Sequence, residues 1–211
     1  QACAYVDRVE NIAMRGAPQF YPRSVVDQAS VRCPDIHVAE AMEQRILEVR
    51  AQGDTLGGSV VAVISGVPAG WGEPVFDKLQ AVLAHAMWSL PAVKAMEIGS
   101  GIEGSHMLGT KHNDAWVQQD GKKARTQTNH SGGIQGGISN GEDIVLRIAF
   151  KPVSTVMQTQ QSIDQDGNEV EIVGKGRHDP CVLPRAVPLV EAMAMLVLVD
   201  EWLKNRTVRL S

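Results

Sequence analysis

The stretch that most constrains this chain runs from Gly174 to Pro188 and leads directly into an apolar segment, Leu189–Leu203. Its three prolines fix their own φ angles and restrict the residues before them. The segment from Ala186 to Leu203 is interrupted only by Glu191 and by Asp200-Glu201. This pattern predicts a helix that is apolar nearly all round and therefore buried, and too interrupted to span a bilayer.

The loop before this helix carries the charged triplet Arg177-His178-Asp179, preceded by glycines that let the backbone approach a ligand closely. Ligand-binding and catalytic groups tend to lie on loops that rigid elements support. The alternative is a solvated basic turn in front of a core helix. The stretch alone leaves both interpretations open.

Composition limits the class of protein. The chain has 211 residues, 44% hydrophobic and 21% charged, which predicts one globular domain over residues 1–211. A formal net charge of −4 and 4% aromatic residues argue against nucleic-acid binding. Cys3, Cys33 and Cys181 are odd in number and far apart, which favours free thiols in a reducing compartment. The histidine and cysteine spacings predict no metal site.

We find no secretory signal in the sequence. The chain begins with Gln1 and not with Met, and we interpret it as a piece of a longer protein. Strands and helices alternate along it, which predicts an α/β or an α+β fold. The expected strands are Cys3–Val6, Ser59–Ile64, Val93–Ile98, Ile144–Phe150 and Glu169–Val173. The expected helices run from the Asp35 cap to about Gly53, from Pro74 to Pro91, and over Ala186–Leu203.

Two polar regions predict surface features. Residues 103–128 are expected to form an irregular excursion, with a turn at Asn113-Asp114 and a solvated hairpin tip at Asp120–Lys123. Residues 158–169 are expected to form a mobile flap around an Asp166-Gly167-Asn168 turn.

Two further segments offer ligand chemistry. Asn129–Gly141 is glycine-rich, so it can present backbone N–H groups to an anion or a flat ring, although a tight turn between strands is the simpler interpretation. Lys151–Thr155 offers a cation and two hydroxyls for an oxyanion. If both met the Arg177–Asp179 loop, they would bind a phosphorylated ligand beside one base, Asp179. A hydrolase or kinase is the weaker alternative, because no P-loop or metal ligands are present.

Six segments, in this order, give the chain a close resemblance to the chorismate synthase family from about Arg32 onward. They are Gly53–Gly58, Gly66–Asp77, Glu97–Gly101, Asn129–Ser139, Lys151-Pro152 and Gly176–Cys181. The resemblance implies an α+β fold in which antiparallel sheets sandwich central helices, and a homotetramer located in the cytoplasm, or in a plastid if the source is a plant or alga.

The implied reaction is the 1,4-elimination of phosphate from 5-enolpyruvylshikimate 3-phosphate to give chorismate. Reduced FMN is required although there is no net redox change, and the family is also linked to NADP. A flavin would carry the difficult chemistry while the protein supplies orientation and charge. The implied partners are therefore this substrate, FMN and further copies of the chain, with no nucleic acid and no membrane.

The resemblance also implies roles for individual residues. The FMN contacts would be Pro91, Ala92, Gly136, Lys151, Pro152, Val153, Ser154, Thr155 and Arg177. Arg177 would also face the substrate phosphate, and Asp179 would be the catalytic base that takes a proton from the flavin. Pro91 departs from the family, which often has asparagine there.

The family's two catalytic histidines, arginine-rich substrate grip and N-terminal flavin segment do not occur in these residues. His130 and His178 do not match those histidines. We therefore expect no turnover from this chain alone. The alternative is a non-catalytic FMN-binding or assembly module with the same fold.

Overall fold

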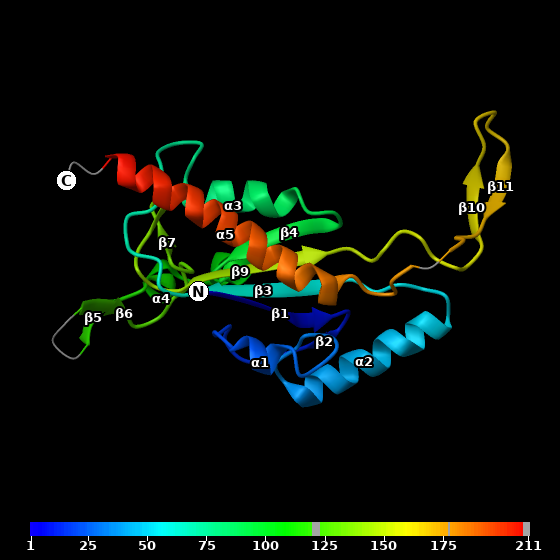
Figure 1. Cartoon of the computed structure of the whole chain (residues 1–211), viewed down its shortest axis with the longest axis horizontal. Helices are drawn as coiled ribbons and strands as arrows, with labels where there is room; N and C mark the ends of the chain where they lie inside the picture. The colour runs from blue at the N-terminus through cyan, green and yellow to red at the C-terminus, as the bar shows by residue number, and fades with distance from the viewer. Residues whose placement is uncertain (120–122, 177, 209–211) are drawn as a thin grey trace.

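The computed structural model describes residues 1–119, 123–176 and 178–208, and its centre is a five-stranded antiparallel sheet (Figure 1). The strand order is β2-β1-β3-β9-β4. These strands are β1 (Ala2–Val9), β2 (Ile12–Ala13), β3 (Gly58–Ile64), β4 (Val93–Ile98) and β9 (Ile144–Phe150). The predicted strands in these regions are confirmed, and β1 is longer than expected.

The register between β3 and β9 builds the main core. Val60 lies opposite Ile148, and Ala62 lies opposite Leu146. All four are buried on the same face of the sheet, because alternate residues of paired strands point to one side. β9 alternates between buried and half-buried positions, whereas β3, at the middle of the sheet, is buried along nearly its whole length.

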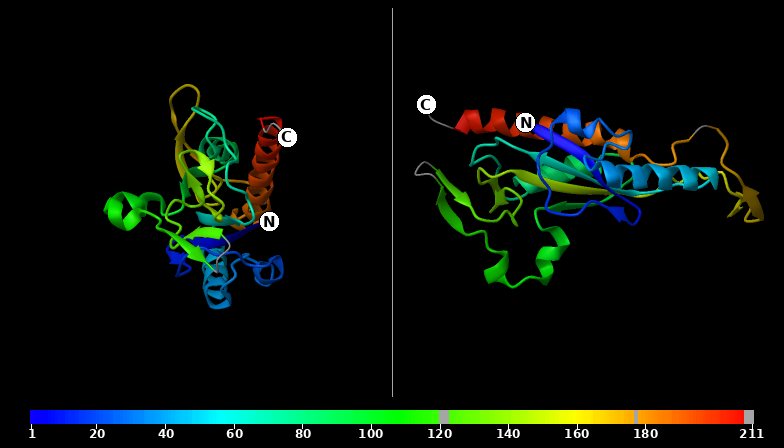
Figure 2. Two further views of the ribbon diagram at one scale, coloured as in Figure 1. Left: turned by 90° about the vertical axis from the view of Figure 1, so that its left-hand side faces the viewer. Right: turned by 90° about the horizontal axis from the view of Figure 1, so that it is seen from below.

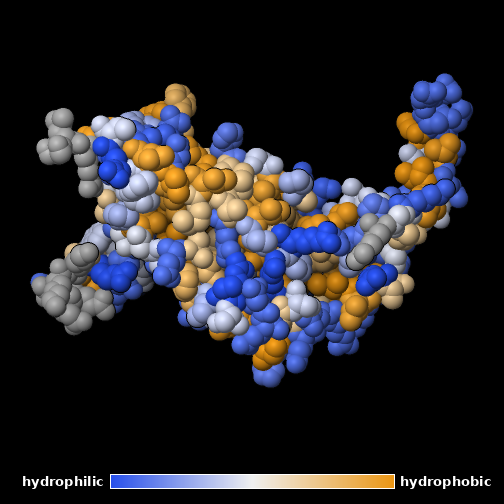
Figure 3. All heavy atoms as spheres, in the orientation of Figure 1, coloured by the Kyte–Doolittle hydropathy of each residue, from blue (hydrophilic) through white to orange (hydrophobic). Residues whose placement is uncertain are grey.

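Helices α3 (Leu79–Trp88) and α5 (Leu183–Val208) pack together on this core face of the sheet. The prediction that α5 is buried all round is wrong. Its inner side, including Val190, Ala194 and Leu198, is buried against the sheet, but Leu196 is 66% exposed. Figure 3 shows hydrophobic residues gathered over this helix, and the exposed outward residues are Leu189, Met195, Leu196, Val199, Trp202 and Leu203.

The opposite face of the sheet carries a cross-strand polar network. The Arg147 guanidinium on β9 lies 3.0 Å from an Asp7 oxygen and 3.5 Å from a Glu97 oxygen. Ser59 Oγ donates a hydrogen bond of 2.7 Å to the other Asp7 oxygen. Figure 2 shows η1 (Gly101–His106) and α4 (Gly109–His112) projecting on this side, away from α5.

Asp35 caps helix α2 (Ile36–Ala51), as predicted, and α1 (Arg23–Val26) precedes it. The Asp35 carboxylate accepts hydrogen bonds from the backbone N–H groups of His37 and Val38, which satisfies two donors of the first turn. Ala39, Met42 and Val49 are buried, as the spacing predicted.

The helix expected from Pro74 starts later, at Leu79, which corrects the prediction. The Asp77 N–H donates a hydrogen bond to the Pro74 carbonyl in a turn, and the Leu79 N–H donates one to the carbonyl of Gly137. This tertiary hydrogen bond satisfies a backbone group at the helix start, so the capping residue lies at Lys78 and not in front of Pro74. Phe76 is left 88% exposed with φ +81°.

The polar excursion contains more regular structure than predicted. It holds η1, α4 and an antiparallel hairpin of β5 (Trp116–Gln119) and β6 (Lys123–Thr126). Asp114 was expected in a surface turn but is buried. Residues 120–122 of the predicted hairpin tip lie outside the described residues.

The predicted flap is an antiparallel hairpin of β10 (Gln160–Ile163) and β11 (Glu169–Ile172) that projects from one end of the molecule (Figure 1). Residues 160–172 contain four carboxylates and no basic residue, so they hold the whole formal net charge of −4. The Asp164 carboxylate accepts the N–H groups of Asp166 and Asn168 and thereby fixes the turn.

The three cysteines are free, as predicted, and all three are buried. Within the described part of the chain, none of the helices combines the length and apolar character needed to cross a membrane.

The one-sided burial of α5 leads to a stability prediction. Leu198→Ala should lower the free energy of unfolding by about 2–5 kcal/mol, because it leaves a cavity against the sheet. Leu196→Ala, on the outer side of the same helix, should change it by less than about 0.5 kcal/mol. Urea denaturation followed by circular dichroism measures both, and equal losses would contradict the described packing.

Candidate functional site

One end of the sheet brings together two of the segments that the sequence singled out. The Lys151 N–H, directly after β9, donates a hydrogen bond of 2.9 Å to the carbonyl of Ala92, directly before β4. Ala92 has φ +68°, a left-handed conformation that is unfavourable for a residue with a side chain and tends to occur at functional sites. Pro91-Ala92 and Lys151 therefore lie side by side.

The segment after Lys151 is held by the turn that precedes β3. Thr55 Oγ1 donates a hydrogen bond of 2.7 Å to the carbonyl of Val153. A Cβ on Gly57 would lie 2.5 Å from the Phe150 carbonyl oxygen and 2.9 Å from Pro152. Only glycine fits this close backbone approach, and this explains why the motif Gly53–Gly58 has a glycine at position 57.

The Asp179 loop is attached to the same turn. The Leu56 N–H donates to the Pro180 carbonyl at 2.7 Å, and Leu56 forms an isolated parallel bridge with Cys181. On the other side, the Gly174 N–H bonds the Val156 carbonyl at 3.0 Å. Lys151–Thr155 and the Asp179 loop are thus tied to each other and to residues 55–57.

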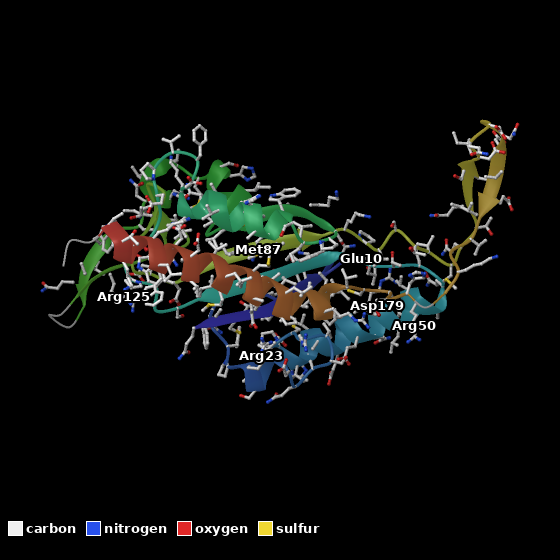
Figure 4. All side chains as sticks on the ribbon, turned by 45° about the horizontal axis from the view of Figure 1, so that its top comes forward. Glu10, Arg23, Arg50, Met87, Arg125 and Asp179 are labelled. Atoms are coloured by element: carbon white, nitrogen blue, oxygen red, sulfur yellow. The ribbon has the colours of Figure 1, made fainter. Side chains whose placement is uncertain are left out.

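A cavity of about 240 Å³ lies between these segments. Its lining includes Arg50, Asp54, Thr55, Thr155, His178 and Asp179. Figure 4 shows Arg50 and Asp179 at this end of the molecule, from α2 and from the loop before α5. The volume is below the usual range of about 300–1,000 Å³ for a whole small-molecule site, so this cavity suits part of a ligand.

Asp179 is one of two carboxylates that line this cavity, and Asp54 is the other. One oxygen of Asp179 lies 2.8 Å from the Arg185 guanidinium, and the side chain is 32% exposed. Neighbouring His178 is turned back, with Nε2 3.0 Å from the Lys175 carbonyl oxygen. The predicted site residue Arg177 lies outside the described residues.

Gly136 does not join this group in the same chain. It lies in the turn between β7 (Ile134–Gln135) and β8 (Ile138–Ser139), where Gly136 and Gly137 have φ +63° and +100°. This is the tight turn that the sequence favoured. Gly136 lines a separate cavity of about 450 Å³ with His112 and His130. β9 separates the two ends by about 20 Å, its seven residues rising roughly 3.4 Å each.

Asp114 anchors this glycine-rich end. Its carboxylate accepts hydrogen bonds from Thr128 Oγ1 at 2.7 Å, the His130 N–H at 2.7 Å and the Ser131 N–H at 2.9 Å. Burial alone would raise the pKa of Asp114, but these donors hold it at about 2, below the usual 3.8. A carboxylate with this many donors favours its charged form.

Sequence reasoning missed Arg50, Thr55 and Asp54 as lining residues. Helical periodicity does not show what the last turn of a helix faces, so it gives Arg50 no functional role. A usable signal was present, since the glycine motif Gly53–Gly58 begins three residues after Arg50.

The low pKa of Asp114 makes stability depend on pH. Its contribution to the free energy of unfolding, about 2 kcal/mol, should be complete above pH 3.8 and be lost as the pH falls towards 2. The reason is that the unfolded state binds the proton at a higher pH than the folded state does. Asp114→Asn should lower the free energy of unfolding at pH 7 by about that amount and flatten its pH dependence between pH 4 and 2. Urea titrations across this range provide the measurement.

The matched control is Asp166→Asn, an exposed carboxylate in the β10–β11 turn. It should change the free energy of unfolding by less than about 0.5 kcal/mol. An Asp114→Asn protein with the parent's acid sensitivity would show that this carboxylate does not anchor the loop.

Comparison with known proteins identifies the family of this chain. The family model described as chorismate synthase matches residues 1–203, and so begins ahead of Arg32, where the motifs placed the start. The chorismate synthase of Opitutus terrae is 53% identical over 202 residues, covering 96% of this chain and 55% of that protein. That of Christiangramia forsetii is 54% identical over 207 residues, covering 98% of this chain and 57% of that protein.

A solved crystal structure of chorismate synthase superposes with a TM-score of 0.77 at 24% identity, covering 97% of this chain and 57% of that one. This likeness confirms the expected α+β fold with antiparallel sheets. The chain spans a little over half the length of the curated relatives it matches. On the family match and these identities, the chain belongs to the chorismate synthase family.

Proposed function

We propose that this chain supplies one part of a chorismate synthase that converts 5-enolpyruvylshikimate 3-phosphate to chorismate and phosphate with reduced FMN. Relatives that are about half identical over nearly the whole chain carry the name of this enzyme. The single observation that carries the proposal is the convergence of Ala92, Lys151–Thr155 and Asp179 at one end of the sheet.

The residues at this end fit a phosphorylated flavin. Lys151 is exposed, and no ion pair engages it within the described part of the chain. Thr155 adds a hydroxyl to the cavity, and the left-handed backbone at Ala92 turns the chain sharply beside Lys151. A cation and a hydroxyl suit phosphate oxygens, while close backbone suits a flat ring.

Each group has a proposed role. When bound, reduced FMN supplies the electron density that the elimination needs. Lys151 and Thr155 would bind and orient anionic oxygens, and preorganised charge of this kind stabilises a leaving phosphate. Asp179 would accept a proton on the carboxylate oxygen that Arg185 does not engage.

Gly136 lies outside this group of residues. It lies at the far end of β9 from Lys151, so it would reach the same flavin only from a neighbouring copy of the chain. This supports a homo-oligomer, and we propose the tetramer that the family resemblance implies.

Turnover is proposed to need residues that these 211 do not include. The chain covers 55% of the Opitutus terrae relative, and the cavity of about 240 Å³ suits only part of a ligand. The exposed apolar side of α5 is typical of a surface that another protein segment or subunit covers. The same surface favours the second candidate, a non-catalytic assembly module.

Two assays test the proposal. Flavin titration of the folded chain should show saturable binding of FMN, whereas no binding of oxidised or reduced FMN would favour the assembly module. Anaerobic addition of reduced FMN and 5-enolpyruvylshikimate 3-phosphate should give no chorismate absorbance with this chain. The full-length Opitutus terrae relative is the positive control, and robust turnover by the 211 residues would refute the claim that they are insufficient.

A further inference from the structure

Arg50 occupies an unusual position for a helix surface arginine. It lies in the last turn of α2, and its side chain lines the cavity that also contains Thr155 and Asp179 (Figure 4). Among the ion pairs of the described residues, none involves Arg50. Its guanidinium therefore has a full set of donors available beside the candidate site.

The other arginine of α2, Arg45, provides a contrast. Arg45 makes two hydrogen bonds with the Glu10 carboxylate, at 2.8 and 3.1 Å, and one with Glu48 at 3.4 Å. These partners raise the pKa of Arg45 and direct its side chain away from the cavity, which it does not line. Arg45 is thus a structural arginine on the same helix.

The charges around the cavity also single out Arg50. Asp179 is paired with Arg185, and an Asp54 oxygen accepts the Thr55 N–H at 2.8 Å. Both carboxylates would repel an anion at short range, and in the described lining Arg50 is the guanidinium that no carboxylate engages. Among the described lining residues, Arg50 is therefore the cation available to an anion in this cavity.

We propose that Arg50 binds the phosphate monoester of a ligand in this cavity, together with the hydroxyl of Thr155; this rests on the proposed function. A guanidinium presents two parallel N–H donors that match two oxygens of a phosphate. The phosphate could be that of the flavin or that of the substrate, and both have the same chemistry at this contact.

The test compares ligands with and without the phosphate. FMN and riboflavin differ only by that group, so the 211-residue chain, R50A, R50K and R45A are titrated with each by flavin fluorescence. R50A should weaken FMN binding by about tenfold, the loss expected for one charge-assisted contact, and leave riboflavin affinity within about twofold. R50K should lose less FMN affinity than R50A. R45A should bind both ligands with the affinity of the parent.

A second arm identifies the source of the phosphate. Calorimetric titration with 5-enolpyruvylshikimate 3-phosphate is run on the same four proteins. If R50A loses affinity only for this ligand, the contact is assigned to the substrate phosphate. If it loses affinity only for FMN, the contact is assigned to the flavin phosphate. Thermal melts check that each variant is folded.

Failures of the two proposals are distinguishable. If the parent chain binds neither FMN nor riboflavin, the flavin site proposed for this chain fails, and the substrate arm alone decides the role of Arg50. The inference about Arg50 is overturned if R50A binds both phosphate ligands as the parent does, if riboflavin loses as much affinity as FMN, or if the parent binds neither phosphate ligand.

Discussion

The pairing of β9 with β3 on one side and β4 on the other is the interaction on which the rest of this structure depends. β9 connects the glycine hairpin at one end to Lys151 at the other. The Lys151–Ala92 hydrogen bond extends the β4–β9 ladder by one step. A shift of one residue in this register would expose Leu146 and Ile148 and would also separate Lys151 from Ala92.

Ion pairs on the face of the sheet opposite α5 favour the same register. Arg147 contacts Asp7 on β1 and Glu97 on β4, so a single side chain on β9 joins three strands. Half-buried charges need paired partners, because an unpaired charge in that position is costly. Apolar packing on one face and ion pairing on the other thus favour one alignment, which positions both ends of β9.

Much of the local structure could be predicted from the sequence, because it depends on neighbouring residues. The Asp35 cap, the alternation in Ile144–Phe150 and the turn at Gly136-Gly137 follow from hydrogen-bonding capacity, side-chain alternation and glycine's freedom at positive φ. The candidate site could be predicted in part for the same reason, since Lys151–Thr155 and Asp179 stand in glycine- and proline-marked loops.

The remainder depends on partners far away in the sequence. The exposed side of α5 could not be predicted, because the sequence of an apolar helix does not show how many of its sides other elements cover. The late start of α3 depends on the Gly137 carbonyl, and the burial of Asp114 depends on donors from residues 128–131. Arg50 shows the same limit, since the cavity that it lines forms only when Thr155 and Asp179 fold against α2.

The most direct test of the account is a map of amide chemical-shift changes on titrating FMN into the isotope-labelled chain. A flavin held at the end of the sheet where β9 meets Lys151 should shift the amides of Thr55, Ala92, Thr155 and Asp179 together. Shifts confined to the hairpin around Gly136 and to His130, with that end of the sheet unchanged, would contradict it.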